Sequence, residues 1–155
     1  MRITGFFDER FEPPAPFIRT VLNSKKLGLS HRLHLHVDTG ASVTIIFDKD
    51  IELLGINPTK LKKAERNVGG IGGTVDTYII EDATLLFRTQ DRKIHEEKLR
   101  LFVGKHDPTK LSTNEIEIIM RMPSLLGRDI IHRFKLVCNK SKDEIYLESP
   151  PPLYR

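Results

Sequence analysis

The sequence has almost no cysteine, the residue whose disulfides stabilise many secreted proteins, and no apolar run long enough to cross a membrane. Its 155 residues include one cysteine, three tyrosines and no tryptophan. The single cysteine, Cys138, excludes a disulfide within the chain and is typical of a reducing compartment. We expect a buried thiol in a strand rather than a catalytic one. Charges interrupt the first ten residues, so we expect neither a secretory segment nor a membrane partner, and a cytoplasmic location.

The distribution of the basic residues argues against nucleic acid as a partner. Lysine and arginine number 25 against 21 acidic residues, which gives a net charge of +4. These basic residues are scattered, lack interleaved aromatic residues and form no recognisable nucleic-acid module, so a solvated surface is expected. With 39% hydrophobic and 30% charged residues, the length fits one compact domain spanning residues 1–155.

Alternating apolar residues separated by turn signals predict many short strands. The expected strands span residues 17–22, 31–37, 75–80, 83–87, 98–103, 116–120, 134–137 and 144–148. A short helix is expected at 48–54, with Asp48 as its N-cap and Gly55 just beyond its end. A second is expected after Leu126. Residues 8–16 are too rich in proline for a helix and form an extended lead-in.

The predicted strand at 31–37 leads directly into Asp38-Thr39-Gly40. An acidic residue between two β-type runs is costly unless it is hydrogen-bonded or used for chemistry. The Thr39 hydroxyl can bond to backbone across a tight turn, and Gly40 lets backbone amides approach a carboxylate without a side chain in the way. The combination predicts one carboxylate held at a strand end.

Two further motifs stand out. The run Gly69-Gly70-Ile71-Gly72-Gly73 predicts a hairpin tip, either a plain turn or a lid that closes over a ligand. It lacks the helix and spacing of a dinucleotide site and the Lys-Ser/Thr of a phosphate loop. The segment Leu125-Leu126-Gly127-Arg128-Asp129 predicts a strand end at which Gly127 permits another backbone to cross closely. Its arginine and aspartate are typical of a structural ion pair at a helix start.

In their order and spacing, these motifs resemble those of the retropepsins, the dimeric, retroviral-type branch of the aspartic proteases. The matches are Asp38-Thr39-Gly40-Ala41, the glycine run, and Leu125-Leu126-Gly127-Arg128 before a helix. The segment 126–147 is more similar to cellular and prokaryotic members. The resemblance covers a core of about 17–148 and leaves the proline-rich ends outside. It implies an all-β, retropepsin-like barrel with a flap hairpin and one or two short helices.

The resemblance also implies a function and a set of site residues. The chain would be an aspartic endopeptidase that cuts peptide or protein substrates without a cofactor or metal. Asp38 would be the catalytic aspartate, the Thr39 hydroxyl would grip the partner chain's loop, and the Gly40 N–H would face the carboxylate. The implied substrate-binding residues are His36, Ala41, Gly69, Gly70, Ile71, Gly72 and Leu125. As a hypothesis, apolar subsites are expected at Val43, Ile45, Ile71, Val75 and Leu125.

One Asp-Thr-Gly motif makes only half of such a site. Two neighbouring carboxylates share one proton, so that one member acts as a base on water and the other as an acid. A chain of 155 residues is too short for two such lobes, which predicts a C₂ homodimer and activity at mildly acidic pH. Ser42 stands where viral members carry an acid that partners the arginine, so the acceptor for Arg128 is left open. His36 shares strand parity with Asp38, at a position usually apolar in the family.

Two other functions fit parts of the pattern. His34, His36 and Asp38 form an H-x-H-x-D run that resembles the start of the metallo-β-lactamase zinc motif, although Thr39 stands where the trailing histidine belongs. The two histidines alone also fit a half-exposed strand face. The second alternative keeps the fold and the dimer but drops catalysis, leaving a peptide-binding module. An intact Asp-Thr-Gly argues against it, because binding has no use for a buried pair of like charges.

Overall fold

A closed ring of six strands forms the centre of the computed structural model, which describes residues 1–70 and 73–150. The ring runs β3, β4, β11, β5, β10 and β9, and the pairing of β9 with β3 closes it. The pairs β4–β11 and β5–β10 are parallel, and the other four are antiparallel. The expected all-β barrel is confirmed, with three short α-helices among the described residues where one or two were expected.

The bounds of the strands are β1 Arg2–Thr4, β2 Phe6–Asp8, β3 Ala15–Ser24, β4 Leu29–Val37, β5 Ile45–Ile46, β6 Lys62–Lys63, β7 Gly69–Gly70, β8 Gly73–Thr74, β9 Asp76–Arg88, β10 Ile94–Lys105, β11 Leu125–Leu126, β12 Lys135–Asn139 and β13 Glu144–Glu148. The helices are α1 Asp48–Leu54, α2 Thr113–Ile119 and α3 Arg128–Ile131, with single 3₁₀ turns η1 Pro58–Lys60, η2 Pro108–Lys110 and η3 Lys140–Lys142.

Alternation along β4 shows why the ring closes around an apolar core. Leu33, Leu35 and Val37 are buried, while the residues between them point away from the core. A period of two places every second side chain on the same face. The other barrel strands supply much of the rest of the main hydrophobic cluster. Ile51 of α1, Ile130 of α3 and Leu147 of β13 also belong to it.

The long strand β9 differs from the expectation of two strands, 75–80 and 83–87. Its pairing with β10 continues through the polar pair Glu81-Asp82, where these two residues lie opposite Arg100 alone. Such a bulge shifts the inward-facing phase by one residue, so Ile80 and Ala83, three positions apart, both belong to the main hydrophobic cluster. The polar pair that reads as a break in the sequence is therefore accommodated within one strand.

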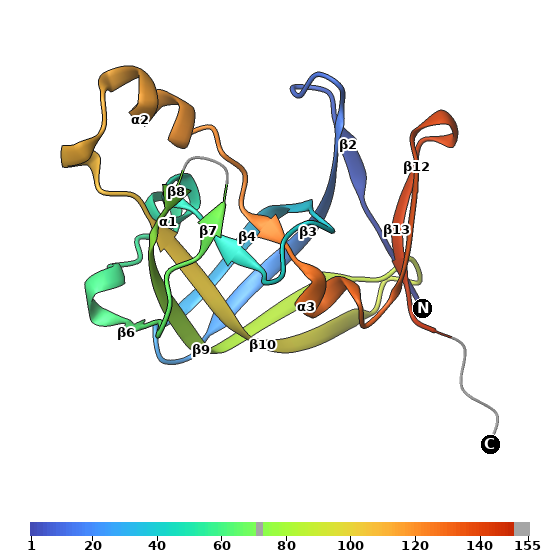
Figure 1. Cartoon of the computed structure of the whole chain (residues 1–155). Helices are drawn as coiled ribbons and strands as arrows, with labels where there is room; N and C mark the ends of the chain where they lie inside the picture. The colour runs from blue at the N-terminus through green and yellow to red at the C-terminus, as the bar shows by residue number, and fades with distance from the viewer. Residues whose placement is uncertain (71–72, 151–155) are drawn as a thin grey trace.

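The chain ends meet in a separate three-stranded sheet of order β1-β13-β12. The β12–β13 hairpin projects from the barrel at the right of Figure 1. This hairpin was expected, but the expected burial of Cys138 is wrong, because its thiol is exposed. The reason is that β12 is the outer strand of this small sheet, so neighbouring strands cover it on one side only.

Helix α1 has the expected bounds, but its N-cap residue is Phe47 rather than Asp48. The carboxylate of Asp48 instead accepts hydrogen bonds from Lys105 Nζ and the His106 backbone, both at 3.0 Å, and from His106 Nδ1. Gly55 ends the helix in the left-handed conformation, as expected. The Asp48 side chain therefore binds residues at the end of β10 instead of capping its own helix.

The segment 116–120, expected to be a strand, belongs mostly to helix α2. Ser112 and Glu115 form a capping box at its start, with bonds in both directions between the two residues. A reciprocal cap satisfies two of the free amides at a helix start, and it outweighs the β preference of three isoleucines. Helix α2 projects beyond the barrel at the upper left of Figure 1.

The close approach at Gly127 fixes how the third motif crosses the loop after β4. A Cβ atom at this position would lie 2.3 Å from the carbonyl carbon and 2.4 Å from the oxygen of Val43. Real carbon contacts do not reach such distances, so only glycine fits. The expected backbone crossing at Gly127 is confirmed.

We predict that Gly127→Ala destabilises the fold by about 1–3 kcal/mol or more, because both partners of the collision are backbone. Gly28→Asn is the matched control, since nothing lies within 4 Å of a Cβ at Gly28 and asparagine tolerates its positive φ. Thermal unfolding of both variants measures the effect. Equal melting temperatures for the Gly127→Ala variant and the wild type would contradict this packing.

Candidate active site

The Asp38 carboxylate lies immediately after the last residue of β4. Its Oδ1 accepts a hydrogen bond of 2.8 Å from the Gly40 N–H. A Cβ at Gly40 would lie 3.0 Å from the same oxygen, so a side chain there would press on the carboxylate. The Asp38 N–H donates to Leu126 O at 3.1 Å. The expectation that Gly40 faces the carboxylate with its N–H agrees with this geometry.

The segment 125–129 binds the loop that carries Asp38. The Arg128 N–H donates to Ala41 O at 2.9 Å, and Arg128 Nη1 donates to Thr39 O at 2.8 Å. The acceptor that the sequence left open for Arg128 is thus a backbone carbonyl of the Asp-Thr-Gly loop. This contact fixes the peptide unit next to the carboxylate.

Asp129 and Thr44 form a further set of bonds between these two segments, which no motif in the sequence predicts. Both Asp129 oxygens accept the Thr44 N–H at 3.0 Å, and Oδ1 also accepts the Thr44 hydroxyl at 2.7 Å. The Gly127 N–H in turn donates to Thr44 Oγ1 at 3.0 Å. Arg128 and Asp129 therefore bind different parts of the loop, and the expected ion pair between them is not found among the described residues.

The Thr39 side chain is exposed. Within the part of the chain that the structure describes, its hydroxyl makes no hydrogen bond, although its carbonyl binds Arg128. Ala41 also belongs to this loop, and its N–H closes a turn onto Asp38 O at 3.2 Å. The Thr39 hydroxyl is thus exposed beside the carboxylate.

His36 lies on the same strand as Asp38, two residues earlier, and is half-buried among aromatic rings. Its ring stacks against Phe11 at 6.5 Å and is tilted against Phe17 at 5.3 Å between centroids. Burial lowers the pKa of His36 below its ordinary value, and the Asp38 charge opposes this effect without overcoming it. The contribution of Phe11, which comes from the proline-rich lead-in, could not be read from the sequence.

A small apolar cluster adjoins the loop and is separate from the main core. It contains Ile45, Phe47 and Val75, with Leu125 among the partly buried residues packed against it. Three of the expected apolar subsite positions (Ile45, Val75 and Leu125) therefore lie together. Val43 does not belong to this cluster and instead contacts Gly127 through its backbone.

The glycine run forms the paired strands β7 and β8, with Gly69 opposite Thr74 and Gly70 opposite Gly73. This pairing places a hairpin at the expected position. The expected flap-tip residues Ile71 and Gly72 lie outside the described residues. The structure therefore describes the two arms of the hairpin.

His34 and His36 lie on the outward face of β4, and each contacts at least one aromatic ring. His34 contacts the edge of Phe6 at 5.1 Å between centroids. In residues 1–70 and 73–150, no group of three or more His, Cys, Asp or Glu side chains has the arrangement of a metal site. Over the same residues, no helix has the length and apolarity needed to traverse a bilayer.

Comparison with known proteins agrees with the motifs. Residues 26–101, which include the Asp38 loop and the glycine hairpin, match a family described as "Aspartyl protease". The fold matches a retropepsin-like aspartic protease from Rickettsia conorii, with a TM-score of 0.54 and 22% identity over 96% of this chain and 89% of that one. The chain therefore contains a segment that matches the aspartyl protease family, and it has a retropepsin-like fold.

A second solved structure similar to this retropepsin-like chain is the EIAV protease complexed with the inhibitor HBY-793. It has a TM-score of 0.49 and 19% identity, over 80% of this chain and 93% of that one. No curated protein sequence matches the chain. The resemblance read from the three motifs agrees with the family match over residues 26–101 and with the fold shared with the Rickettsia conorii protein.

We predict that Thr44→Val lowers the free energy of unfolding by about 1–3 kcal/mol, because it leaves the buried Gly127 N–H and one Asp129 oxygen without their hydroxyl partner. Thr44→Ser keeps the hydroxyl and is the matched control. Chemical denaturation of the two variants measures the difference. If serine proves as destabilising as valine, methyl packing rather than hydrogen bonding accounts for the loss.

We predict that His36 makes the protein less stable in acid. Its folded pKa lies below the ordinary value, so the unfolded chain binds the proton more readily and stability is lost as the pH falls below about 6.5. In His36→Phe, the melting temperature should fall less between about pH 8 and pH 5 than in the wild type. His31→Gln changes an exposed histidine and should leave the wild-type pH dependence intact.

Proposed function

We propose that this chain is an aspartic endopeptidase, active as a homodimer in which two Asp38 carboxylates meet on a two-fold axis. The observation that carries the proposal is the fixed Asp38 carboxylate, held by the Gly40 N–H at 2.8 Å in a loop clamped by residues 126–129. The match of residues 26–101 to a family described as "Aspartyl protease" supports the same reaction.

The chemistry requires two carboxylates that share one proton. The ionised member accepts a proton from a water molecule, which attacks the carbonyl carbon of the scissile peptide bond. The protonated member donates a hydrogen bond to the carbonyl oxygen as negative charge develops on it. No covalent bond to the protein forms at any step. The pair loses one form or the other at the extremes of pH, so activity should be greatest at mildly acidic pH.

The homodimer follows from the content of one chain. Asp38 is part of the only Asp-Thr-Gly in the sequence, so the second carboxylate must come from a second copy. The exposed Thr39 hydroxyl, which has no partner within the described residues, is placed beside Asp38, where it can bind the equivalent loop of the other subunit. A C₂ arrangement brings identical loops together at the axis.

The substrate would lie as an extended strand between the glycine hairpin and the Asp38 loops. Gly69 and Gly70, with Ile71 and Gly72, would form the flap that covers it through backbone groups. Ala41, Leu125 and His36 would line the cleft, and the cluster of Ile45, Val75 and Leu125 supports a preference for apolar side chains. We assign no cofactor or metal to this reaction.

We further propose that residues 1–155 form a single retropepsin-like domain. The N-terminal strands support this, since β1 pairs with β13 and β2 with β3. The free, exposed thiol of Cys138 supports a reducing, cytoplasmic compartment.

We predict that Asp38→Asn abolishes peptide cleavage while the protein remains folded and dimeric. The asparagine keeps Oδ1, which accepts the Gly40 N–H, but it cannot act as a base. Asp76→Asn, at an exposed aspartate, is the control and should retain full activity. Cleavage of a peptide library at about pH 4–6, followed by mass spectrometry, measures both. Cleavage by the Asp38→Asn protein at the wild-type rate would overturn the proposed function.

We predict that mixed dimers are inactive, because each active site needs both carboxylates. When wild-type and Asp38→Asn subunits are mixed, unfolded and refolded together, activity should follow the square of the wild-type fraction. An equal mixture should then show about a quarter of the activity of the same total amount of wild type. A linear fall, to about half, would instead indicate that each chain works alone.

A further inference from the structure

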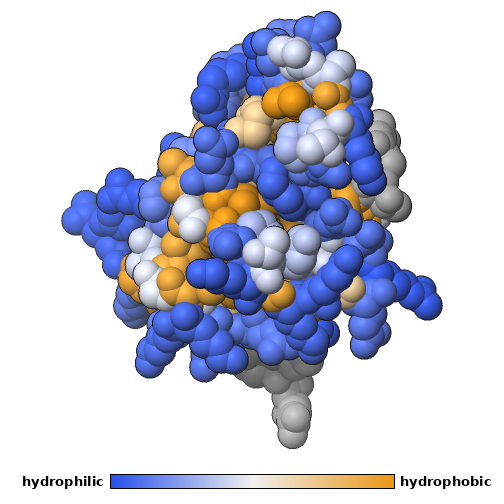
Figure 2. All heavy atoms as spheres, turned by 90° about the vertical axis from the view of Figure 1, so that its left-hand side faces the viewer, coloured by the Kyte–Doolittle hydropathy of each residue, from blue (hydrophilic) through white to orange (hydrophobic). Residues whose placement is uncertain are grey.

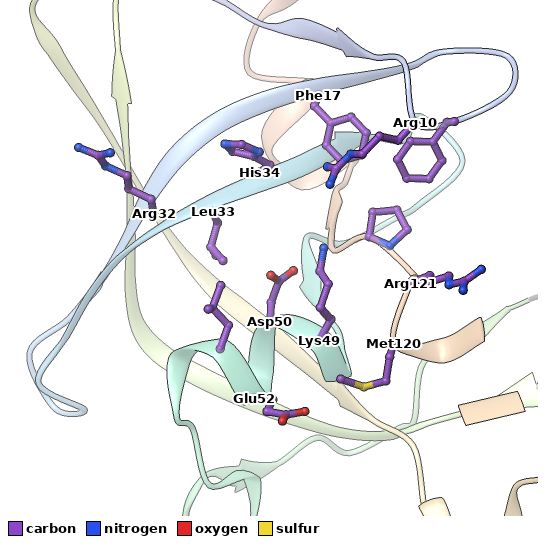
Figure 3. A pocket seen from close by; sticks show the side chains of 13 residues that line it. Arg10, Phe17, Arg32, Leu33, His34, Lys49, Asp50, Glu52, Met120 and Arg121 are labelled. Carbon is purple, nitrogen blue, oxygen red and sulfur yellow. The ribbon is translucent and has the colours of Figure 1, made fainter. Parts of the chain in front are cut away.

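A pocket of about 880 Å³ opens on the outer side of the barrel, apart from the Asp38 loop. Its walls come from β4, from the lead-in around Phe11, from helix α1, and from the segment that follows α2. In Figure 3, Arg10, Phe17 and His34 lie on one side of the pocket, and Lys49 and Met120 lie across from them. None of the roles in the proposed reaction uses it.

The inner surface of this pocket is mainly apolar. Phe17 and Leu33 are buried in its wall. Leu53, at its edge on α1, is 59% exposed, which is unusual for a leucine beside other apolar groups. On the side of the molecule that carries α2, hydrophobic patches are interrupted and bordered by hydrophilic side chains (Figure 2). An exposed leucine next to an open apolar pocket is typical of a surface that binds another molecule, because binding removes the apolar groups from water.

Positive charge dominates the rim. Arg10, Arg32, Lys49 and Arg121 line the pocket, against Asp50 and Glu52. Arg10 is paired with Asp8, and the buried Asp50 carboxylate accepts the Ser124 hydroxyl. Arg32, Lys49 and Arg121 make no ion pair within the described residues. The rim therefore attracts negative charge, and the interior accepts an apolar side chain.

The pocket is linked to the candidate active site through aromatic side chains in its wall. Phe17, in its wall, packs against the His36 ring at 5.3 Å, and His34, His36 and Asp38 follow one another at every second position of the chain. Four positions of extended chain span about 13 Å. A peptide that is bound at Asp38 and runs alongside β4 would therefore reach the pocket with a residue about four positions from the scissile bond.

We propose that this pocket binds a distal segment of the substrate, consisting of a large apolar side chain next to one or more carboxylates. The proposal rests on the proposed function and adds a substrate class to it. Each subunit of the dimer contributes one such pocket, so an acidic and apolar segment is favoured on either side of the cleaved bond. The pocket acts in binding and takes no part in the chemistry.

Binding to the full-length Asp38→Asn protein tests this without cleavage. Two fluorescein-labelled peptides share their central residues and differ four positions away, where one carries Leu-Glu-Glu and the other Ala-Gln-Gln. Fluorescence anisotropy gives the Kd of each. The Leu-Glu-Glu peptide should bind more tightly, and Lys49→Glu combined with Arg121→Glu should weaken it about tenfold, while the Ala-Gln-Gln peptide changes by less than about twofold.

Two further variants separate charge from apolar contact. Lys26→Glu combined with Lys142→Glu makes a similar change of charge at exposed sites outside the pocket and should leave both peptides unaffected. Leu53→Ser removes the exposed leucine without disturbing the core, and it should weaken only the Leu-Glu-Glu peptide.

Equal affinity of the two peptides, including binding of neither, overturns the pocket assignment, as does an equal loss in the control variant. Cleavage of both peptides by the wild type is measured separately. Cleavage without discrimination between the peptides would reject the pocket and leave the protease standing. Pocket-dependent binding without cleavage would reject the protease and leave the pocket as a peptide-binding site.

Discussion

The clamp that residues 126–129 form on the loop after β4 is the constraint on which the rest of the site depends. Within the Asp-Thr-Gly turn, the Gly40 N–H binds the Asp38 carboxylate, but the turn alone does not fix the position of the loop that carries both residues. Here Leu126, Gly127, Arg128 and Asp129 each bond to that loop. Because Gly127 lies in contact with the Val43 backbone, the two segments have no room to slide past one another. The barrel strands serve to bring these segments to the same place.

The sequence predicted the parts of the fold that follow from local pattern. Alternation of apolar residues along 31–37 is sufficient to predict most of β4. The failures are equally physical. The isoleucines of 116–120 have strong β preference, but a capping box at Ser112 and Glu115 turns them into a helix. The Asp48 carboxylate binds Lys105 and His106, which are distant in sequence, so no local rule could find it.

The candidate site shows the same division. The roles of Asp38, Gly40 and Gly127 can be predicted because they follow from single residues and short motifs. Thr44 was not, since a threonine in an apolar run reads as an ordinary β residue, and its role depends on Asp129, 85 positions away. Phe11 was missed because a proline-rich lead-in gives no sign that it folds back over His36. Long-range partners are what a single sequence does not reveal.

The distance in sequence between the two halves of the clamp has a consequence for synthesis. The bonds to Thr39 and Thr44 come from residues 83 to 89 positions later. Before residues 126–129 leave the ribosome, Asp38 has already emerged, but the bonds that hold its loop cannot yet form. The loop is therefore fixed only after residues 126–129 have also emerged and folded against it. Until then, the Asp38 loop lacks the bonds that hold it in the folded protein.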